Sequence, residues 1–209
     1  MLLKKASKTE MQLMVETLLD AFAEDMLWNF ISNFNKRVRE LVFRFLIVLG
    51  LRNGKVFVSP GFEGVAVWLP SVSFWVTLRA AWKEIILCLF ISPRGLFRTI
   101  QYLDFCTSIE DEVAPKGHWT LFPFGIAREY QRKGIGTSLM KESLSYFEEV
   151  GVPCYLDTDE NTISFYERFG FVAAEAYPYQ KGQWAFQVIP MLRSSLVLTE
   201  EMALSLSTV

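Results

Sequence analysis

Hydrophobic and polar residues alternate along this chain with two different periods, which divide it into helical and extended stretches. Near the start, Met14, Leu18 and Ala21 share one side of a helix that Ser7 or Thr9 would cap. Apolar runs bounded by Gly, Pro or Asn predict strands instead. Helices are expected over residues 7–23, 25–34, 35–51, 74–90, 93–109, 137–150 and 161–170. Strands are expected over residues 2–6, 55–59, 63–69, 118–127, 151–156, 171–176 and 184–190.

Two of the expected strands have features that place them in a sheet. Residues 64–70 are apolar throughout, which is typical of a central strand, and the turn at Pro60-Gly61 joins this strand to the preceding one as a hairpin. Residues 118–127 contain Pro123, which cannot donate to a strand ladder and therefore predicts an edge or a bulge. The last strand, residues 184–190, is expected to pair with residues 171–176.

The composition predicts a large aromatic core and narrows the class of protein. Of 209 residues, 51% are hydrophobic and 18 are Phe, and the formal net charge is −2. This balance gives no basic field, so nucleic acid is not an expected partner. The single His118 and three separated cysteines match neither a metal motif nor a disulfide framework, so no metal is expected and a cytoplasmic location fits best.

Targeting and membrane signals are weak. The first residues, Met1-Leu2-Leu3-Lys4-Lys5, become charged too soon for a secretory signal peptide. The apolar runs over residues 41–51 and 85–91 are shorter than the roughly 20 residues that a transmembrane helix needs. We expect no membrane span. Contact with a membrane surface through residues 71–110 is a weaker alternative.

A glycine-containing segment, residues 128–136, is the strongest functional signal. It reads Arg-Glu-Tyr-Gln-Arg-Lys-Gly-Ile-Gly and joins an expected strand to an expected helix. Unpaired N–H groups at a helix start, together with the helix dipole, favour a phosphate or pyrophosphate. The Lys-Ser/Thr ending of a P-loop is missing, and Leu139 stands where a dinucleotide fingerprint needs its third glycine.

What remains, Gln131-x-x-Gly134-x-Gly136, resembles the acyl-CoA pyrophosphate loop of the GCN5-related N-acetyltransferase (GNAT) family. A downstream stretch, Asn161-x-x-x-x-Tyr166-x-x-x-Gly170-Phe171, is similar to the second half of that family. The resemblance is strong over residues 118–190 and looser before them. It implies an α/β (α+β) fold with a mixed, mostly antiparallel central sheet, splayed fourth and fifth strands, and helices on both faces. Residues 1–209 would form a single domain, with a helical insertion at 71–117 and a tail at 194–209.

The resemblance also implies roles for particular residues. Acetyl-CoA would be the co-substrate, and Tyr166 would serve as the catalytic donor to the departing thiolate, since a phenol with a pKa of about 10 is a good donor to a thiolate with a pKa of about 8.5. Asn161 would either reach the cofactor or simply cap its helix. Cofactor binding is assigned to Phe124, Ile126, Gln131, Arg132, Lys133, Gly134, Ile135, Gly136, Thr137 and Asn161.

The general base is left open by the sequence. Some family members carry a Glu early in the fourth strand, and that place holds Thr120 here, which cannot act as a base. The candidates are His118, Glu63, Asp157 and Asp159, or a water chain to solvent. The acceptor is also open: aromatic residues that could line its pocket or belong to the core are Trp28, Trp75, Trp82, Tyr177 and Tyr179.

The leading hypothesis is an N-acyltransferase that passes acetyl from acetyl-CoA to a small-molecule amine by direct attack. No cysteine lies in a nucleophile motif, which agrees with a reaction without a covalent enzyme intermediate. The alternative is a catalytically silent acyl-CoA-binding or regulatory domain of the same fold, which the missing acid of the fourth strand favours. A homodimer is compatible with either hypothesis.

Overall fold

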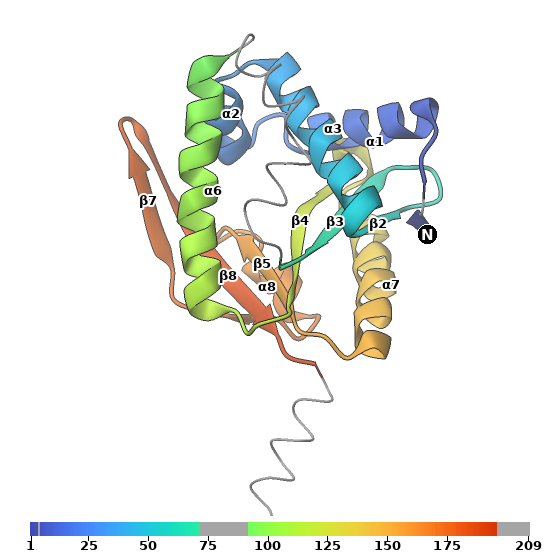
Figure 1. The fold of residues 1–209 in the computed structure, drawn as a ribbon. Helices are drawn as coiled ribbons and strands as arrows, with labels where there is room; N and C mark the ends of the chain where they lie inside the picture. The colour runs from blue at the N-terminus through green and yellow to red at the C-terminus, as the bar shows by residue number, and fades with distance from the viewer. Residues whose placement is uncertain (4, 72–91, 196–209) are drawn as a thin grey trace, which may run out of the picture.

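The protein is an eight-stranded mixed sheet with helices on both faces, in a computed structural model that describes residues 1–3, 5–71 and 92–195 (Figure 1). Along the sheet the strand order is β1-β2-β3-β4-β5-β8-β6, with β7 paired to β8 outside this path. All strand pairs are antiparallel except β4 with β5. The fold class predicted from the sequence is confirmed.

The helices begin and end close to the predicted positions because the sequence carries their caps. Ser7 forms a capping box with Glu10, Asp25 accepts from the Trp28 N–H, and Asn35 caps the helix that follows it. The helices are α1 (Lys8–Ala21), α2 (Met26–Ser32), α3 (Lys36–Asn53), α6 (Pro93–Val113), α7 (Ile135–Val150) and α8 (Ile163–Glu167), with a 3₁₀ turn at Arg128–Tyr130.

The strands follow the predicted order, with one addition. They are β1 (Leu2–Leu3), β2 (Lys55–Val58), β3 (Gly64–Pro70), β4 (Trp119–Ile126), β5 (Cys154–Thr158), β6 (Val172–Ala173), β7 (Tyr177–Lys181) and β8 (Trp184–Arg193). The predicted hairpin is β2–β3, and β3 lies between β2 and β4, as its continuous apolar run indicates.

Side-chain alternation divides the core into two layers. Val65 and Val67 point to the layer beneath α1, α2, α3 and α6, whereas Ala66 and Trp68 point to the layer beneath α7. Figure 1 shows α7 on the opposite side of the sheet from α3. Each fully buried large apolar side chain in these layers stabilises the fold by about 1.5–3 kcal/mol relative to exposure.

Strand β4 contains the predicted bulge and leaves its neighbour early. Phe124 is opposite Ala66 and Leu121 is opposite Trp68, so β4 holds one extra residue at the position of Pro123. Toward β5 it pairs only through Trp119 with Cys154 and Thr120 with Tyr155, after which the two strands separate. The predicted splay of the fourth and fifth strands is confirmed.

The predicted pairing at the C-terminal end is wrong in part. Residues 184–190 pair chiefly with β7, which the sequence analysis assigned to no element, and β6 meets β8 only at Met191 and Leu192. Pro178 argues against a strand at β7 in the sequence, although Tyr177 and Tyr179 lie on either side of it. Gly182, at φ +60, makes the turn between β7 and β8. The result is an antiparallel hairpin that packs beside α6 (Figure 1).

The helical insertion is present as α6, which reaches Val113 rather than the expected residue 109. The helix expected over residues 74–90, with Trp75 and Trp82, and residues 196–209 of the expected tail lie outside the described residues. No helix within the described ranges is long and apolar enough to cross a membrane. The same residues contain no cluster of three His, Cys, Asp or Glu side chains that could hold a metal ion.

Candidate functional site

A cleft of about 1380 Å³ opens where β4 and β5 separate, and it runs from the start of α7 to α6. We call the part next to α7 and α8 the loop end and the part next to α6 the acidic end. Described residues that line the loop end are Phe124, Ile126, Gln131, Arg132, Gly134, Gly136, Thr137, Asn161 and Tyr166. Those that line the acidic end are Asp25, Trp28, Cys106, Glu110, Asp111, Thr120, Phe122, Asp157 and Asp159.

At the loop end, the chain turns into α7 without using its backbone donors. Gly134 is the N-cap at φ +84, and Arg132 is also left-handed at φ +59. Within the described residues, the first hydrogen bond back into this turn is from the Ser138 N–H to the Gly134 carbonyl, and the N–H groups from Arg132 to Thr137 have no partner. Unpaired donors at the positive end of a helix form an anion-binding cradle.

The second glycine of the motif has neither a positive φ nor a contact that would exclude a side-chain carbon. A Cβ on Gly136 would lie 3.4 Å from the Ile126 side chain and 3.6 Å from Phe165. At Gly134, in contrast, nothing lies within 4 Å of such an atom, so the positive φ alone demands glycine. The backbone therefore requires glycine at Gly134, while the start of α7 at Gly136 lies in ordinary contact range of Ile126 on β4.

The predicted cofactor contacts on β4 face the opening. The Ile126 carbonyl accepts the Gln131 side-chain amide at 3.0 Å, so it points away from β3 and toward the loop. Phe124 stands two residues earlier and therefore directs its main-chain groups the same way. Gln131 thus braces the loop against β4. Of the remaining loop residues, Arg132 lines the cleft, whereas Lys133 lies over the Tyr130 ring at 5.4 Å and Ile135 is not among the lining residues.

Tyr166 and Asn161 reach the loop end from the turn and helix that follow β5. The Tyr166 ring packs edge-on against Phe124, Phe165 and Phe171, and its hydroxyl has no hydrogen-bond partner within the described chain. Burial raises the pKa of Tyr166 well above its usual value, so the phenol keeps its proton at neutral pH. A protonated hydroxyl without a partner is available to a bound molecule.

The alternative role for Asn161 as a helix cap is wrong, because the N-cap of α8 is Thr162. The Asn161 N–H donates to the Asp159 carboxylate at 2.7 Å, and Asp159 also accepts from the Thr162 hydroxyl. The Asn161 side chain itself is exposed, lines the cleft and makes no hydrogen bond within the described residues. It is therefore free to contact a ligand.

The acidic end is organised by Glu110, which the sequence analysis did not single out. Its carboxylate accepts from the Thr120 hydroxyl and lies 2.5 Å from Nε2 of His118. A carboxylate from α6 thus occupies the place beside Thr120 where the resemblance implies an acid on the strand itself. Neither the helical spacing nor any motif distinguishes Glu110 from the other acids of α6, so the sequence carried no signal for it.

His118 cannot act directly on a molecule in the cleft. The ring is 4% exposed, its Nδ1 lies 2.8 Å from the Pro115 carbonyl, and its Nε2 is held by Glu110. Burial alone would lower the pKa of His118, but the bonds to Glu110 and Pro115 raise it above its usual value. Both ring nitrogens face oxygen acceptors, which favours the protonated ring, and His118 pairs with Glu110 behind the residues that line the cleft.

Asp157 has a different environment from Glu110. It projects from β5 into the cleft, and the Tyr155 hydroxyl donates to its Oδ1 at 2.5 Å. Burial is the main cause that raises the pKa of Asp157 to about 6, and the negative charge of Glu110 adds to it. The hydrogen bonds from Tyr155 and Cys106 work in the opposite direction. Asp157 forms no ion pair in the described part of the chain.

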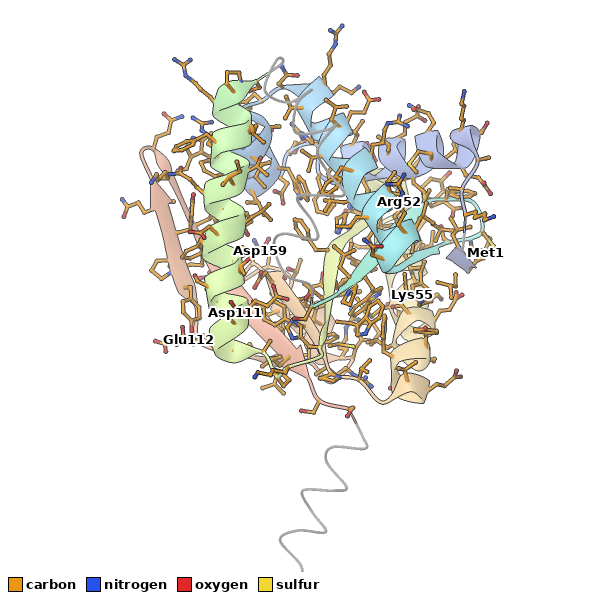
Figure 2. The ribbon with its side chains drawn as sticks, viewed as in Figure 1. Met1, Arg52, Lys55, Asp111, Glu112 and Asp159 are labelled. Carbon is orange, nitrogen blue, oxygen red and sulfur yellow. The ribbon has the colours of Figure 1, made fainter. Side chains whose placement is uncertain are left out.

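The other candidates for a base are occupied elsewhere or structural. Glu63 accepts from the Ser59 hydroxyl at 2.5 Å and from the Gly61 N–H at 3.1 Å, which braces the β2–β3 turn away from the cleft. Asp159, which is labelled in Figure 2, lines the cleft, but its carboxylate accepts from the Asn161 N–H and the Thr162 hydroxyl in the turn before α8.

Aromatic side chains cover the acidic end on one side. Trp28 is 2% exposed and stacks on Phe122 at 5.3 Å, with Phe22 at 5.4 Å. Tyr179 instead belongs to a buried ring cluster outside the cleft, and Tyr177 packs against the same core layer. Of the aromatic residues proposed for the acceptor pocket, Trp28 is therefore the one that the described structure places in the cleft.

Comparison with known proteins confirms the resemblance found in the sequence. Residues 99–171 match the model of the Acetyltransferase (GNAT) family, a segment that contains β4, the glycine loop, α7, β5 and α8. Solved structures share the fold over 93% of this chain. A histone acetyltransferase HPA2 and related acetyltransferase from Corynebacterium glutamicum is 18% identical, with 96% of its own chain covered and a TM-score of 0.57.

Two enzymes from insects are similar to the chain over the same length. Polyamine N-acetyltransferase from Drosophila melanogaster is 12% identical, with 100% of its chain covered and a TM-score of 0.62. Arylalkylamine N-acetyltransferase 2 from Aedes aegypti is 12% identical, with 98% of its chain covered and a TM-score of 0.63. At these identities the likeness establishes a common fold. The acceptor has to be argued from the cleft itself.

Proposed function

We propose that the protein transfers the acetyl group of acetyl-CoA to the amine of a small molecule, with both substrates held together in the cleft. The observation that carries the proposal is the unpaired run of N–H groups from Arg132 to Thr137, which faces the opening between β4 and β5. A pyrophosphate fits the run of unpaired N–H groups. An extended arm with amide groups fits the opening between β4 and β5. Acetyl-CoA contains both parts.

The residues present fit this donor. The N–H groups of the loop would hold the pyrophosphate, and Arg132 and Lys133 would add positive charge. The main-chain groups of Phe124 and Ile126 would pair with the pantetheine amides in place of the β5 strand that has moved away. Asn161 would contact the same arm from the opposite wall.

Tyr166 is the residue we assign to the departing thiolate. Its hydroxyl is protonated and free, and the ring is fixed by Phe124, Phe165 and Phe171. The amine lone pair would form the new C–N bond at the thioester carbonyl while the C–S bond breaks. Tyr166 would then supply the proton that converts the thiolate to a thiol. No covalent enzyme intermediate is needed.

We propose a small, partly apolar amine as acceptor. At the acidic end the described lining residues combine the rings of Trp28 and Phe122 with the carboxylates of Asp25, Asp157 and Asp159. Apolar rings favour the body of such a molecule, and negative charge favours an ammonium group. The similarity in fold to an arylalkylamine and a polyamine N-acetyltransferase is compatible with this choice.

Calorimetric titration with acetyl-CoA, followed by an acceptor screen, tests the proposal. The intact protein should bind acetyl-CoA, and Gly134→Asp/Gly136→Asp should weaken binding by at least about 100-fold, because two carboxylates would face the pyrophosphate. Gly182→Asp is the matched control, since Gly182 also has a positive φ but lies in the β7–β8 turn. It should bind normally.

The screen would use phenethylamine, tryptamine, agmatine and spermidine with acetyl-CoA. We expect acetylation of phenethylamine or tryptamine to be fastest. Acetyl-CoA binding without transfer to any amine would instead support the catalytically silent domain. Transfer to the polyamine alone would exclude a partly apolar acceptor, and no binding of acetyl-CoA would exclude the acetyltransferase altogether.

A further inference from the structure

We propose that Asp157 is the general base of this cleft, which takes a proton from the acceptor's ammonium group, and that Tyr155 positions it. The inference rests on the proposed function, because it assigns the proton acceptor for the same transfer reaction. It follows from where β5 leaves β4, from the hydrogen bond that fixes the Asp157 carboxylate, and from the hydrogen bonds that already engage His118 and Glu110.

Strand geometry places Asp157 at the opening. Tyr155 is the last β5 residue that pairs with β4, opposite Thr120, and Asp157 follows two residues later, where β4 has moved away. Residues two apart on a strand project to the same face. Cys154 and Leu156 point into the core layer under α7, so Tyr155 and Asp157 point to the opposite face, where α6 lies. Asp157 therefore lines the cleft that Tyr166 also lines.

The Asp157 carboxylate is fixed in place but keeps lone pairs that can accept a proton. Tyr155 is fully buried and donates to Oδ1 of Asp157 at 2.5 Å, while the neutral Cys106 thiol of α6 favours the charged carboxylate and lowers its pKa. A carboxylate has about four lone-pair sites, so positions remain for a proton from a bound amine. The donors are neutral, and within the described chain no cation neutralises Asp157.

The surroundings make Asp157 more basic than an exposed aspartate. Burial, with a smaller contribution from the charge of Glu110 on α6, raises its pKa to about 6, against the opposing effects of Tyr155 and Cys106. Tyr102 also faces this group from α6 and is itself a neutral phenol, because burial raises its pKa well above the usual value. At pH 7 Asp157 is therefore mostly ionised and still accepts a proton more readily than an ordinary carboxylate.

The rival groups at the acidic end are already engaged. Both ring nitrogens of His118 are hydrogen-bonded, and the ring does not line the cleft. Glu110 shares one oxygen between the His118 ring and the Thr120 hydroxyl, so this oxygen is already engaged. We assign Glu110 the role of tuning Asp157 by its charge. It does not itself accept the substrate proton.

The protons balance over the reaction. The ammonium group gives one proton to Asp157 and becomes an amine with a free lone pair, which attacks the thioester carbonyl. The second proton lost from nitrogen after attack replaces the one that Tyr166 gives to the thiolate. Asp157 then releases its proton to solvent. The products are the N-acetyl amine, CoA thiol and one proton.

Asp157→Asn tests the proposal with two acceptors of nearly equal shape. Phenethylamine is an ammonium ion at pH 7, whereas 2,2-difluoro-2-phenylethylamine is much less basic, so a large fraction of it is already neutral and depends less on a base. The kcat/KM for phenethylamine should fall by about 10²–10⁴-fold in the variant, the range for loss of a general base. The loss for the difluoro amine should be at least ten times smaller. Acetyl-CoA affinity, measured by calorimetry, should not change.

Asp104→Asn is the matched control, since Asp104 is an exposed acid of α6 outside the cleft. Equal losses for the two amines would overturn the assignment of Asp157, as would wild-type rates with phenethylamine. If the wild-type protein transfers acetyl to neither amine, the proposed function fails instead. The two failures are therefore distinguishable.

Tyr155→Phe provides a second test, which remains valid even if Asp157→Asn does not fold. The Tyr155 hydrogen bond lowers the pKa of Asp157, so its loss should move the acid limb of the kcat/KM profile to higher pH while the plateau is kept. Titration of the Asp157 carboxyl by ¹³C NMR should show the same upward shift without any substrate. An unmoved limb and an unmoved titration would reduce Tyr155 to a structural residue and overturn its assignment.

Discussion

The loop end and the acidic end of the cleft are built in opposite ways. At the loop end the proposed ligand contacts are mostly main-chain N–H groups of consecutive residues, Arg132 to Thr137, and the sequence needs only glycines at the right spacing to expose them. At the acidic end the contacts are side chains from α6, β4 and β5 that meet only after folding. One end follows from local geometry and the other from tertiary packing.

The difference teaches which part of such a site can vary. A site made of main-chain N–H groups accepts many different side chains but few changes of backbone conformation. In a site made of side chains, the same chemical group can be supplied by a different helix or strand. Glu110 illustrates the second case, because its carboxylate reaches Thr120 from a helix. We therefore expect the loop end to determine the acetyl donor and the acidic end to determine the acceptor.

The largest expected effect tests the chemistry of the loop end. Tyr166→Phe should lower kcat by about 10²–10⁴-fold, because the proton for the thiolate would be lost, and should leave acetyl-CoA affinity within about threefold. Steady-state kinetics with phenethylamine and calorimetry measure the two quantities. Phe169→Leu is the control, since Phe169 packs in the same ring cluster without a hydroxyl. Wild-type turnover by Tyr166→Phe would remove Tyr166 from the mechanism.

The sequence revealed these two ends unequally for a physical reason. Gly134 requires a positive φ, and this constraint shows directly in the identity of a single residue. Pro123 likewise marked the bulge that opens β4. Glu110 and Tyr155, in contrast, acquire their roles from partners 10 and 2 residues away in sequence that only the packed sheet orients. The hairpin strand β7 was missed because Pro178 interrupts its pattern.

A second prediction concerns Trp28, which lines the acidic end of the cleft and is also part of the hydrophobic core. Trp28→Ala should reduce the free energy of unfolding by about 3–5 kcal/mol, since Trp28 is 2% exposed and packs on Phe43 at 4.3 Å and on Phe122. Urea denaturation measures this change. Phe97→Ala, at a position 62% exposed on α6, should cost less than about 0.5 kcal/mol. Equal costs would mean that the wall is not part of the core.

A third prediction uses the pH dependence of stability at the His118–Glu110 pair. The folded pKa of His118 is raised above the unfolded value of about 6.5, because the bonds to Glu110 and Pro115 outweigh burial. The stabilisation is therefore fully present below about pH 6.5 and is lost as pH rises through the higher folded pKa. Urea denaturation across this range should show that loss in the wild type and not in His118→Gln. Parallel curves for the two proteins would contradict it.

The smallest expected effect separates ligand contact from folding at the loop end. Asn161→Ala should weaken acetyl-CoA binding by about two- to tenfold, the value of one hydrogen bond, and leave the free energy of unfolding unchanged. The reason is that the Asn161 side chain makes no bond within the described chain, while Thr162 is the N-cap of α8. A capping role would instead cost about 1 kcal/mol of stability and no affinity. Calorimetry and urea denaturation of the same variant distinguish the two. Trp28 lines the cleft and also stabilises the core, whereas Asn161 should contribute to acetyl-CoA binding and not to the stability of the fold.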